Sequence, residues 1–196
     1  MRNIFIIHGS YGYPEENWFP WLKNELKKLG NKIFVPPFPV PKVSTAGGHK
    51  PKEWFKKFSQ YREYINEETI IVSHSRGCIF TYLFLTTLEK SIKAVFLVAP
   101  WIYWKKSWSP KGYEKFIDPF RKNPFDWEKI KRGAKHFEVF QSTNDDIPVK
   151  EGKAIAKKLG GGINIIKNAG HFNTSYDKKF KKFPLLFEKI KLQINQ

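Results

Sequence analysis

The sequence predicts an α/β protein with a mainly parallel sheet covered by helices on both faces, a three-layer, doubly wound arrangement. Short runs of Ile, Val and Phe alternate with segments whose apolar residues recur at helical spacing. Several of these runs are apolar at every position, which is typical of parallel strands buried on both faces. Because ligands bind at the carboxyl ends of the strands in such sheets, the loops that follow the strands are the places to look for chemistry.

The individual elements follow from local patterns. The first strand, residues 4–7, is branched and aromatic throughout and ends at a glycine-containing loop that begins with His8. Apolar residues then recur at helical spacing from Trp18 to Leu29, and Gly30 is a stop signal. The other predicted strands cover residues 32–35, 69–72, 94–99, 137–140 and 163–166, and the other predicted helices cover residues 52–65, 76–88, 150–159 and 179–193.

Two segments have no regular period. Residues 36–51 are rich in proline and glycine, which predicts a long loop. Residues 101–125, after the strand that ends at Ala99, form a short aromatic-rich insertion. We expect this insertion to act as a lid over a substrate pocket, with Trp101, Trp104 and Trp108 as pocket residues. Residues 1–196 are otherwise expected to form a single domain.

The composition limits the classes of protein to consider. The 196 residues carry 35 Lys and Arg against 18 Asp and Glu, a formal net charge of +17. The lysine pairs are spread along the chain, which favours a solvated surface over a nucleic-acid footprint, so nucleic acid is not an expected partner. The single cysteine, Cys78, excludes a disulfide scaffold. No apolar run is long enough to cross a bilayer, and we expect a cytoplasmic protein of undetermined oligomeric state.

A candidate nucleophile follows the predicted strand 69–72. The loop reads Ser73-His74-Ser75-Arg76-Gly77, a G-x-S-x-G pattern with serine in the first glycine position. A sharp turn between strand and helix exposes the hydroxyl of its central serine above the sheet, and small residues on either side keep neighbouring elements from clashing with the turn. Ser75 could instead simply cap the helix, which serine does well. A histidine and an aspartate in the loops after two later strands favour the catalytic interpretation of Ser75.

A serine hydroxyl needs a base to take its proton and a carboxylate to orient that base. His136 and His171 are the histidines that follow Ser75. His136 opens a predicted strand and is expected at the inactive edge, whereas His171 follows the last strand and is chosen as the base. Asp145 and Asp146 lie in the loop after the strand 137–140. We choose Asp145 as the acid that orients His171, and the next residue, Asp146, remains the alternative.

Acyl transfer also needs donors that face the developing oxyanion. The backbone amide of Arg76 is one expected donor, and the amide of Ser10 or Tyr11, in the loop after the first strand, is the other. The histidines are scattered and no acidic cluster shares a loop with them, so no metal site is expected. The glycines of the first loop lack the dinucleotide and P-loop patterns, and no cofactor is expected.

These motifs resemble the α/β-hydrolase superfamily, and more narrowly its small serine hydrolases of the retinoblastoma-binding serine hydrolase and YdeN-type esterase group. The resemblance extends over nearly the whole chain. It rests on the following segments: the His8-Gly9 opening, residues 18–29 followed by Pro36-Pro37, the Ser75 loop, residues 125–130, residues 142–145, and Gly170-His171-Phe172. It implies a compact α/β-hydrolase fold and places nucleophile, acid and base on Ser75, Asp145 and His171.

Together these observations predict a serine hydrolase with a Ser-His-Asp triad and a backbone oxyanion hole. The aromatic insertion favours a carboxylesterase that acts on small, hydrophobic acyl esters. An aminopeptidase or amidase of the same fold is the alternative within this class, although the sequence identifies no residue that would bind a substrate's free amine. A non-catalytic, basic binding protein that keeps the fold is the alternative from a different class.

Overall fold

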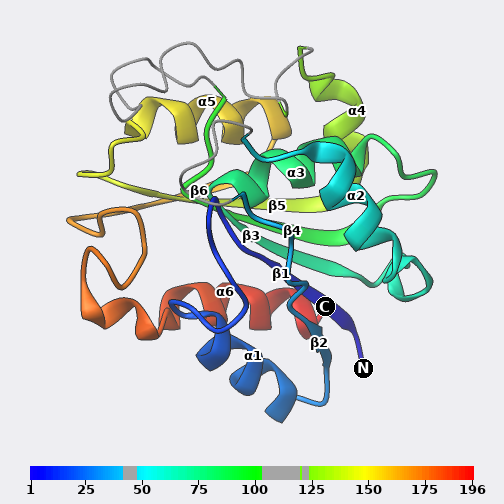
Figure 1. Ribbon diagram of the computed structural model, residues 1–196, viewed down its shortest axis with the longest axis horizontal. Helices are drawn as coiled ribbons and strands as arrows, with labels where there is room; N and C mark the ends of the chain where they lie inside the picture. The colour runs from blue at the N-terminus through cyan, green and yellow to red at the C-terminus, as the bar shows by residue number, and fades with distance from the viewer. Residues whose placement is uncertain (42–47, 103–119, 121–123) are drawn as a thin grey trace.

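The computed structural model describes residues 1–41, 48–102, 120 and 124–196. Within these residues the chain forms one six-stranded sheet in the order β2-β1-β3-β4-β5-β6, and every neighbouring pair is parallel (Figure 1). The strands are β1 (Asn3–Ile7), β2 (Lys32–Phe34), β3 (Ile70–His74), β4 (Ile92–Val98), β5 (Ala134–Ser142) and β6 (Gly162–Ile166). The predicted α/β class and parallel sheet are confirmed.

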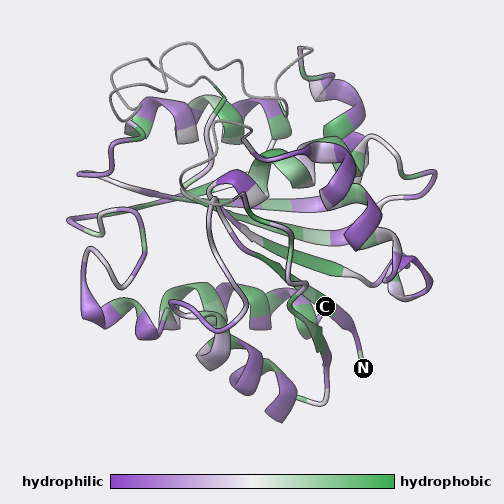
Figure 2. Cartoon of the chain, viewed as in Figure 1, coloured by the Kyte–Doolittle hydropathy of each residue, from purple (hydrophilic) through white to green (hydrophobic). Residues whose placement is uncertain are grey.

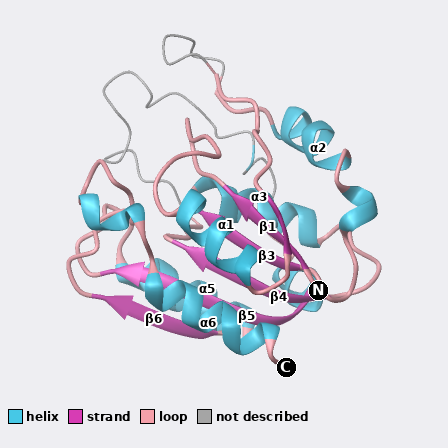
Figure 3. Cartoon of the chain, turned by 90° about the horizontal axis from the view of Figure 1, so that it is seen from below, coloured by secondary structure: helices cyan, strands magenta, loops and turns pink. Residues whose placement is uncertain are grey.

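Helices cover both faces of the sheet. One face carries α1 (Phe19–Lys28) and α6 (Pro184–Ile194), which lie together in front of the strands in Figure 3. The other face carries α2 (Pro51–Ser59), α3 (Arg76–Leu85), α4 (Trp127–Arg132) and α5 (Val149–Leu159). The helices turn apolar residues toward the sheet and polar residues outward, and the strands between them are mostly hydrophobic (Figure 2). This is the predicted three-layer, doubly wound arrangement.

Three helical segments differ from the sequence prediction. The predicted helix 52–65 ends at Ser59 and continues as a separate 3₁₀ turn, Arg62–Tyr64, which brings the Tyr64 ring to 4.7 Å from the ring of Phe34. The predicted helix 179–193 is likewise a 3₁₀ turn followed by α6, because a proline is favoured in the first turn of a helix. The helix α4 was not predicted, since six residues are too few to show a period.

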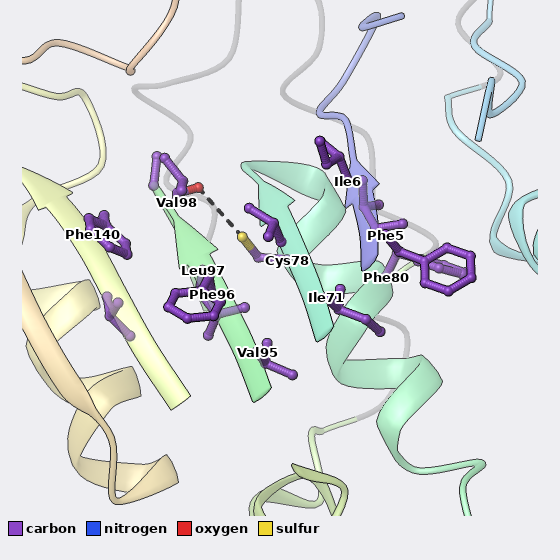
Figure 4. Packing of buried hydrophobic residues seen from close by; sticks show 14 of the residues in the cluster. Phe5, Ile6, Ile71, Cys78, Phe80, Val95, Phe96, Leu97, Val98 and Phe140 are labelled. Atoms are coloured by element: carbon purple, nitrogen blue, oxygen red, sulfur yellow. Dashed lines mark hydrogen bonds between the residues drawn. The ribbon is translucent and has the colours of Figure 1, made fainter. Parts of the chain in front are cut away.

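The core is close-packed around the central strands. Figure 4 shows Cys78 of α3 among Ile, Val and Phe side chains of the sheet, with its Sγ 3.5 Å from the carbonyl oxygen of Val98. Burial raises the pKa of the Cys78 thiol to about 12. The thiol is therefore protonated at neutral pH, as expected for a core residue rather than a reactive cysteine.

The aromatic insertion is described only in part. Trp101, Ile102 and Phe120 are buried against the rest of the chain. Trp104 and Trp108 lie outside the described residues, so their predicted place in the pocket stays a prediction. In the part of the chain that the structure describes, no helix is long and apolar enough to cross a membrane.

The strand order reverses direction between β1 and β3, and the two strands approach closely where they end. The first turn of α3 passes beside the end of β1, so that a Cβ atom on Gly77 would lie 2.6 Å from the carbonyl oxygen of Ile7 and 2.7 Å from that of His8. Both distances are shorter than a carbon–oxygen van der Waals contact. Glycine at position 77 is therefore required by backbone packing, as the sequence pattern predicted.

We expect Gly77→Ala to destabilise the protein, because the added methyl group meets backbone atoms that cannot rotate away. Overpacking of this kind costs about 1–3 kcal/mol or more. Chemical denaturation would measure the change in the free energy of unfolding, with Lys56→Ala on the exposed face of α2 as a control that should have little effect. Equal stability of the Gly77 variant and the native protein would contradict this account of the turn.

Candidate active site

The loops after β1, β3, β5 and β6 border one cavity of about 440 Å³ at the carboxyl end of the sheet. A cavity in this place is expected, because the reversal of strand order leaves a crevice between the loops that follow β1 and β3. Ser75, Asp145 and His171, predicted from three distant stretches of sequence, all border it. So do Ser10 and Trp101, while the Arg76 side chain contacts Ser10.

Ser75 occupies a sharp turn between β3 and α3. Its backbone has φ 53° and ψ −118°, a conformation that residues other than glycine rarely adopt. Two hydrogen bonds hold the turn: the Ser75 amide donates to the carbonyl of Val98 at 2.9 Å, and the Cys78 amide donates to the carbonyl of Ser75 at 3.0 Å. Strained backbone of this kind is kept where the surrounding structure enforces it, and it is common at functional sites.

Ser73 fits the position where the pattern usually has its first glycine. The residue is fully buried at the end of β3, and its hydroxyl oxygen lies 3.5 Å from the carbonyl oxygen of Phe96 on β4. The small side chain is thus accommodated between two strands with a polar partner within reach. The turn at Ser75 does not need a glycine at this position.

His171 and Asp145 form a close pair across the loops after β6 and β5. The Nδ1 atom of His171 lies 3.1 Å and 3.0 Å from the two carboxylate oxygens of Asp145. The Asp145 side chain is only 1% exposed, whereas that of His171 is 31% exposed. The imidazole is therefore held by a buried carboxylate on one side and faces the cavity on the other.

The two neighbouring aspartates differ sharply in their surroundings. Asp145 also accepts a hydrogen bond from the backbone amide of Ile147 at 3.1 Å, which fixes its carboxylate in the turn before α5. Asp146 borders the cavity as well, but it is exposed. Of the two candidates left open by the sequence, Asp145 is the one placed against His171.

The loop after β1 lies directly against the turn at Ser75. A Cβ atom on Gly9 would lie 3.1 Å from the Cβ atom of Ser75, so the backbone of this loop approaches the serine closely. The Ser10 hydroxyl accepts a hydrogen bond from Nε of Arg76 at 2.7 Å, which ties the two loops together. Tyr11 has φ 55° and turns its ring toward His49, at a centroid distance of 4.9 Å.

His8 supports this loop from beneath. Its Nε2 atom accepts a hydrogen bond from the Phe38 amide at 3.1 Å, so the neutral ring carries its hydrogen on Nδ1 and donates to the carbonyl of Gly9 at 2.9 Å. Burial lowers the pKa of His8. The residue is thus a neutral, buried support for the Gly9 backbone. His136 lies near the opposite end of β5, paired with Glu138.

Two residues at the cavity were not predicted. Glu16 is half-buried, borders the cavity, and has its pKa raised by burial. Sequence analysis missed it because it lies in an irregular segment with no motif around it. His74 was not singled out as a site residue, and its Nε2 atom lies 2.9 Å from the carbonyl oxygen of His171. The position of His74 directly before Ser75 in the sequence does not predict this contact.

The remaining polar side chains around the cavity are neutral. Asn17, Asn173 and Ser175 border it together with the apolar side chains of Trp101 and Ile147. Within the described ranges, no group of three or more His, Cys, Asp or Glu side chains could hold a metal ion. The described arrangement therefore brings a serine hydroxyl and an imidazole–carboxylate pair to the border of one cavity.

Comparisons with known proteins identify the family of the chain. The Bacillus subtilis (strain 168) hydrolase YdeN is 28% identical over 196 residues, which cover 95% of this chain and 93% of YdeN. The serine hydrolase RBBP9 of Rattus norvegicus is 27% identical over 177 residues, 87% of this chain and 88% of the relative. The crystal structure of YdeN superposes with a TM-score of 0.85 at 25% identity over the full length of both chains.

A more distant structure shares the fold alone. Est1E from Butyrivibrio proteoclasticus has a TM-score of 0.69 at 15% identity, covering all of this chain and 89% of that one. The model of the serine hydrolase family matches residues 4–191, which include all of the described residues that border the cavity. The chain therefore belongs to the serine hydrolase family.

Proposed function

We propose that this serine hydrolase acts through an acyl-enzyme formed on Ser75, with His171 as the general base and Asp145 as the acid that orients it. The observation that carries the proposal is the pairing of His171 with the buried carboxylate of Asp145, which borders the same cavity as a serine held in a strained strand-to-helix turn. Nucleophile, base and acid follow one another along the chain in the order expected for this fold.

The proposed reaction has two halves, acylation of Ser75 and hydrolysis of the acyl-enzyme, and the same three side chains act in both. Ser75 Oγ attacks the acyl carbon of the substrate while His171 takes its proton through Nε2. The backbone amides of Arg76 and of Ser10 or Tyr11 stabilise the oxyanion. His171 then gives the proton to the leaving group. In the second half, His171 takes a proton from water, the resulting hydroxide attacks the acyl carbon, and His171 returns the proton to Ser75 Oγ as the acyl–oxygen bond breaks. The Asp145 carboxylate stabilises the positive charge that His171 carries between these steps.

The proposed substrates are small, hydrophobic acyl esters, which makes the protein a carboxylesterase. Support comes from Trp101 and Ile147, whose apolar side chains border the cavity. A cavity of about 440 Å³ is within the size range of small-molecule sites. The predicted pocket residues Trp104 and Trp108 remain part of this proposal.

We expect a fluorophosphonate probe to label the native protein covalently and to leave Ser75→Ala unlabelled, because the probe reacts with an activated serine hydroxyl. Mass spectrometry of the intact protein would measure the labelled fraction. Ser175→Ala is the matched control, since Ser175 borders the same cavity outside the turn, and this variant should label like the native protein. Labelling of Ser75→Ala would place the nucleophile elsewhere, and an unlabelled native protein would favour the non-catalytic binding alternative.

We expect Asp145→Asn to reduce kcat on a p-nitrophenyl butyrate substrate far more than Asp146→Asn. An asparagine at position 145 would no longer stabilise the His171 imidazolium or select its tautomer, an effect on the order of 10⁴-fold in comparable triads. Asp146→Asn removes an exposed carboxylate that the structure does not pair with His171 and should change kcat by less than about 10-fold. The reverse ranking in steady-state kinetics would assign the acid to Asp146.

A second candidate function is hydrolysis of esters or amides that carry an ammonium group, as an aminopeptidase or amidase would perform. The observation in its favour is Glu16. Its half-buried carboxylate borders the cavity and forms no ion pair with any Lys or Arg that the structure describes, although the chain is rich in both. The carboxylate lies beside the loop after β1, since a Cβ atom on Gly12 would be 2.5 Å from Glu16 Oε1. A substrate ammonium group would supply a positively charged partner for the Glu16 carboxylate.

Two substrates of equal shape test this candidate. Glycine benzyl ester and benzyl propionate differ by an ammonium group in place of a methyl group. If Glu16 binds the ammonium group, Glu16→Gln should lower kcat/KM for the glycine ester by about 10-fold or more, because hydrogen bonds to charged groups are worth about 1.5–3 kcal/mol, and should leave the propionate unchanged. Glu53→Gln, on the exposed face of α2, is the control. Equal effects of Glu16→Gln on both esters would reject a role for Glu16 in binding an amine.

A further inference from the structure

His74 is a buried polar side chain at the cavity that the proposed reaction does not use. It is the last residue of β3, immediately before Ser75, and is only 4% exposed. Its Nε2 atom lies 2.9 Å from the carbonyl oxygen of His171. Because a carbonyl oxygen can only accept, Nε2 must carry the hydrogen and donate it. One side chain thus connects the strand that presents the nucleophile to the backbone of the base.

The charge state of His74 is compatible with this bond at any pH where the enzyme would work. Burial, together with the neighbouring His171 and His8, lowers the pKa of His74 to about 3, against the favourable bond to the His171 carbonyl. The ring is therefore neutral. A neutral ring does not oppose the positive charge that His171 gains when it accepts a proton, although the two ring centroids are only 4.9 Å apart.

The other anchors of the His171 loop hold residues on either side of it. Ser142 and Asn144, in the acid loop, accept hydrogen bonds from the amides of Ala169 at 2.9 Å and Gly170 at 2.8 Å. The indole of Trp18 donates to the carbonyl of Phe172 at 3.1 Å. These bonds fix the base loop to the acid loop and to the segment before α1. The bond from His74 fixes the base residue itself to the nucleophile strand.

We propose that His74 is a positioning residue that sets the place of the base His171 relative to Ser75. The inference rests on the proposed function, because it assumes that His171 takes the proton of Ser75. A displacement of about 1 Å between reacting groups can cost about 10²-fold in rate. The loss of the bond should therefore appear mainly in kcat, since His74 acts on the base rather than on substrate binding.

Three variants separate positioning from simple filling of space. His74→Gln keeps an N–H donor at nearly the reach of Nε2, His74→Leu keeps the bulk and removes the donor, and His74→Asn keeps a donor with a shorter reach. With p-nitrophenyl butyrate, we expect His74→Leu to lose about 10- to 100-fold in kcat with KM changed by less than about 3-fold, and His74→Gln to recover most of the loss. His136→Gln, a histidine remote from the cavity, is the control.

The pH profile and the thermal transition make the test specific. A positioning role lowers the plateau of kcat/KM in His74→Leu and leaves the midpoint of the acid limb unchanged, because His74 itself does not titrate there. Equal kcat for the Gln and Leu variants, or a kcat loss that follows the loss of thermal stability across the variants, would overturn the proposal in favour of a structural role. Should His74→Leu not fold, the comparison of Gln with Asn decides, since only Gln reaches the carbonyl.

The outcome is distinguishable from a failure of the proposed function. If the native protein is labelled by the fluorophosphonate probe at Ser75 and His74→Leu turns over substrate at the native rate, the positioning role is wrong and the triad stands. If the native protein is not labelled, or is labelled at another residue, the triad is wrong and the role of His74 falls with it.

Discussion

The site depends on how closely the backbone of α3 passes beside the end of β1. Two carbonyl groups, of Ile7 and His8, leave no room for a side chain at position 77, and Gly9 lies against the Cβ atom of Ser75. This crowding leaves no room for α3 to move toward β1, and it accompanies the positive φ of 53° at Ser75. The loop after β1 lies next to the serine in the same crowded region. The proposed nucleophile and the proposed oxyanion donors thus lie at one closely packed junction.

The charge states around the cavity follow from which groups have a partner. The Asp145 carboxylate is almost completely buried and is compensated by the His171 imidazole and by the Ile147 amide. Among the residues that the structure describes, no carboxylate pairs with His8 or His74, and burial lowers the pKa of each, so that each ring is neutral and donates a hydrogen bond to a backbone carbonyl. His171 thus pairs with a carboxylate, whereas His8 and His74 are neutral donors to backbone carbonyls. The difference lies in what faces each ring nitrogen.

The fold and most of the proposed site could be predicted because they depend on local patterns. Apolar runs fix the strands, and the ends of those runs place Ser75, Asp145 and His171 at one edge of a parallel sheet. The choice between Asp145 and Asp146 was not decidable, since it turns on the direction of two side chains in one tight turn. Glu16 and the contact of His74 with His171 were also out of reach, because both come from the packing of segments far apart in the chain.

The basic composition says little about what enters the cavity. The chain carries a net charge of +17, yet the described residues that border the cavity include Glu16, Asp145 and Asp146 and no Lys or Arg. A cleft lined by one sign of charge with low-dielectric walls concentrates its own field, whatever the average charge of the surface. Near Ser75 the described charged side chains are therefore the carboxylates on the cavity border and the Arg76 guanidinium beside Ser10. Lysines such as Lys27, Lys28 and Lys56 are exposed on helices, away from the described residues that border the cavity.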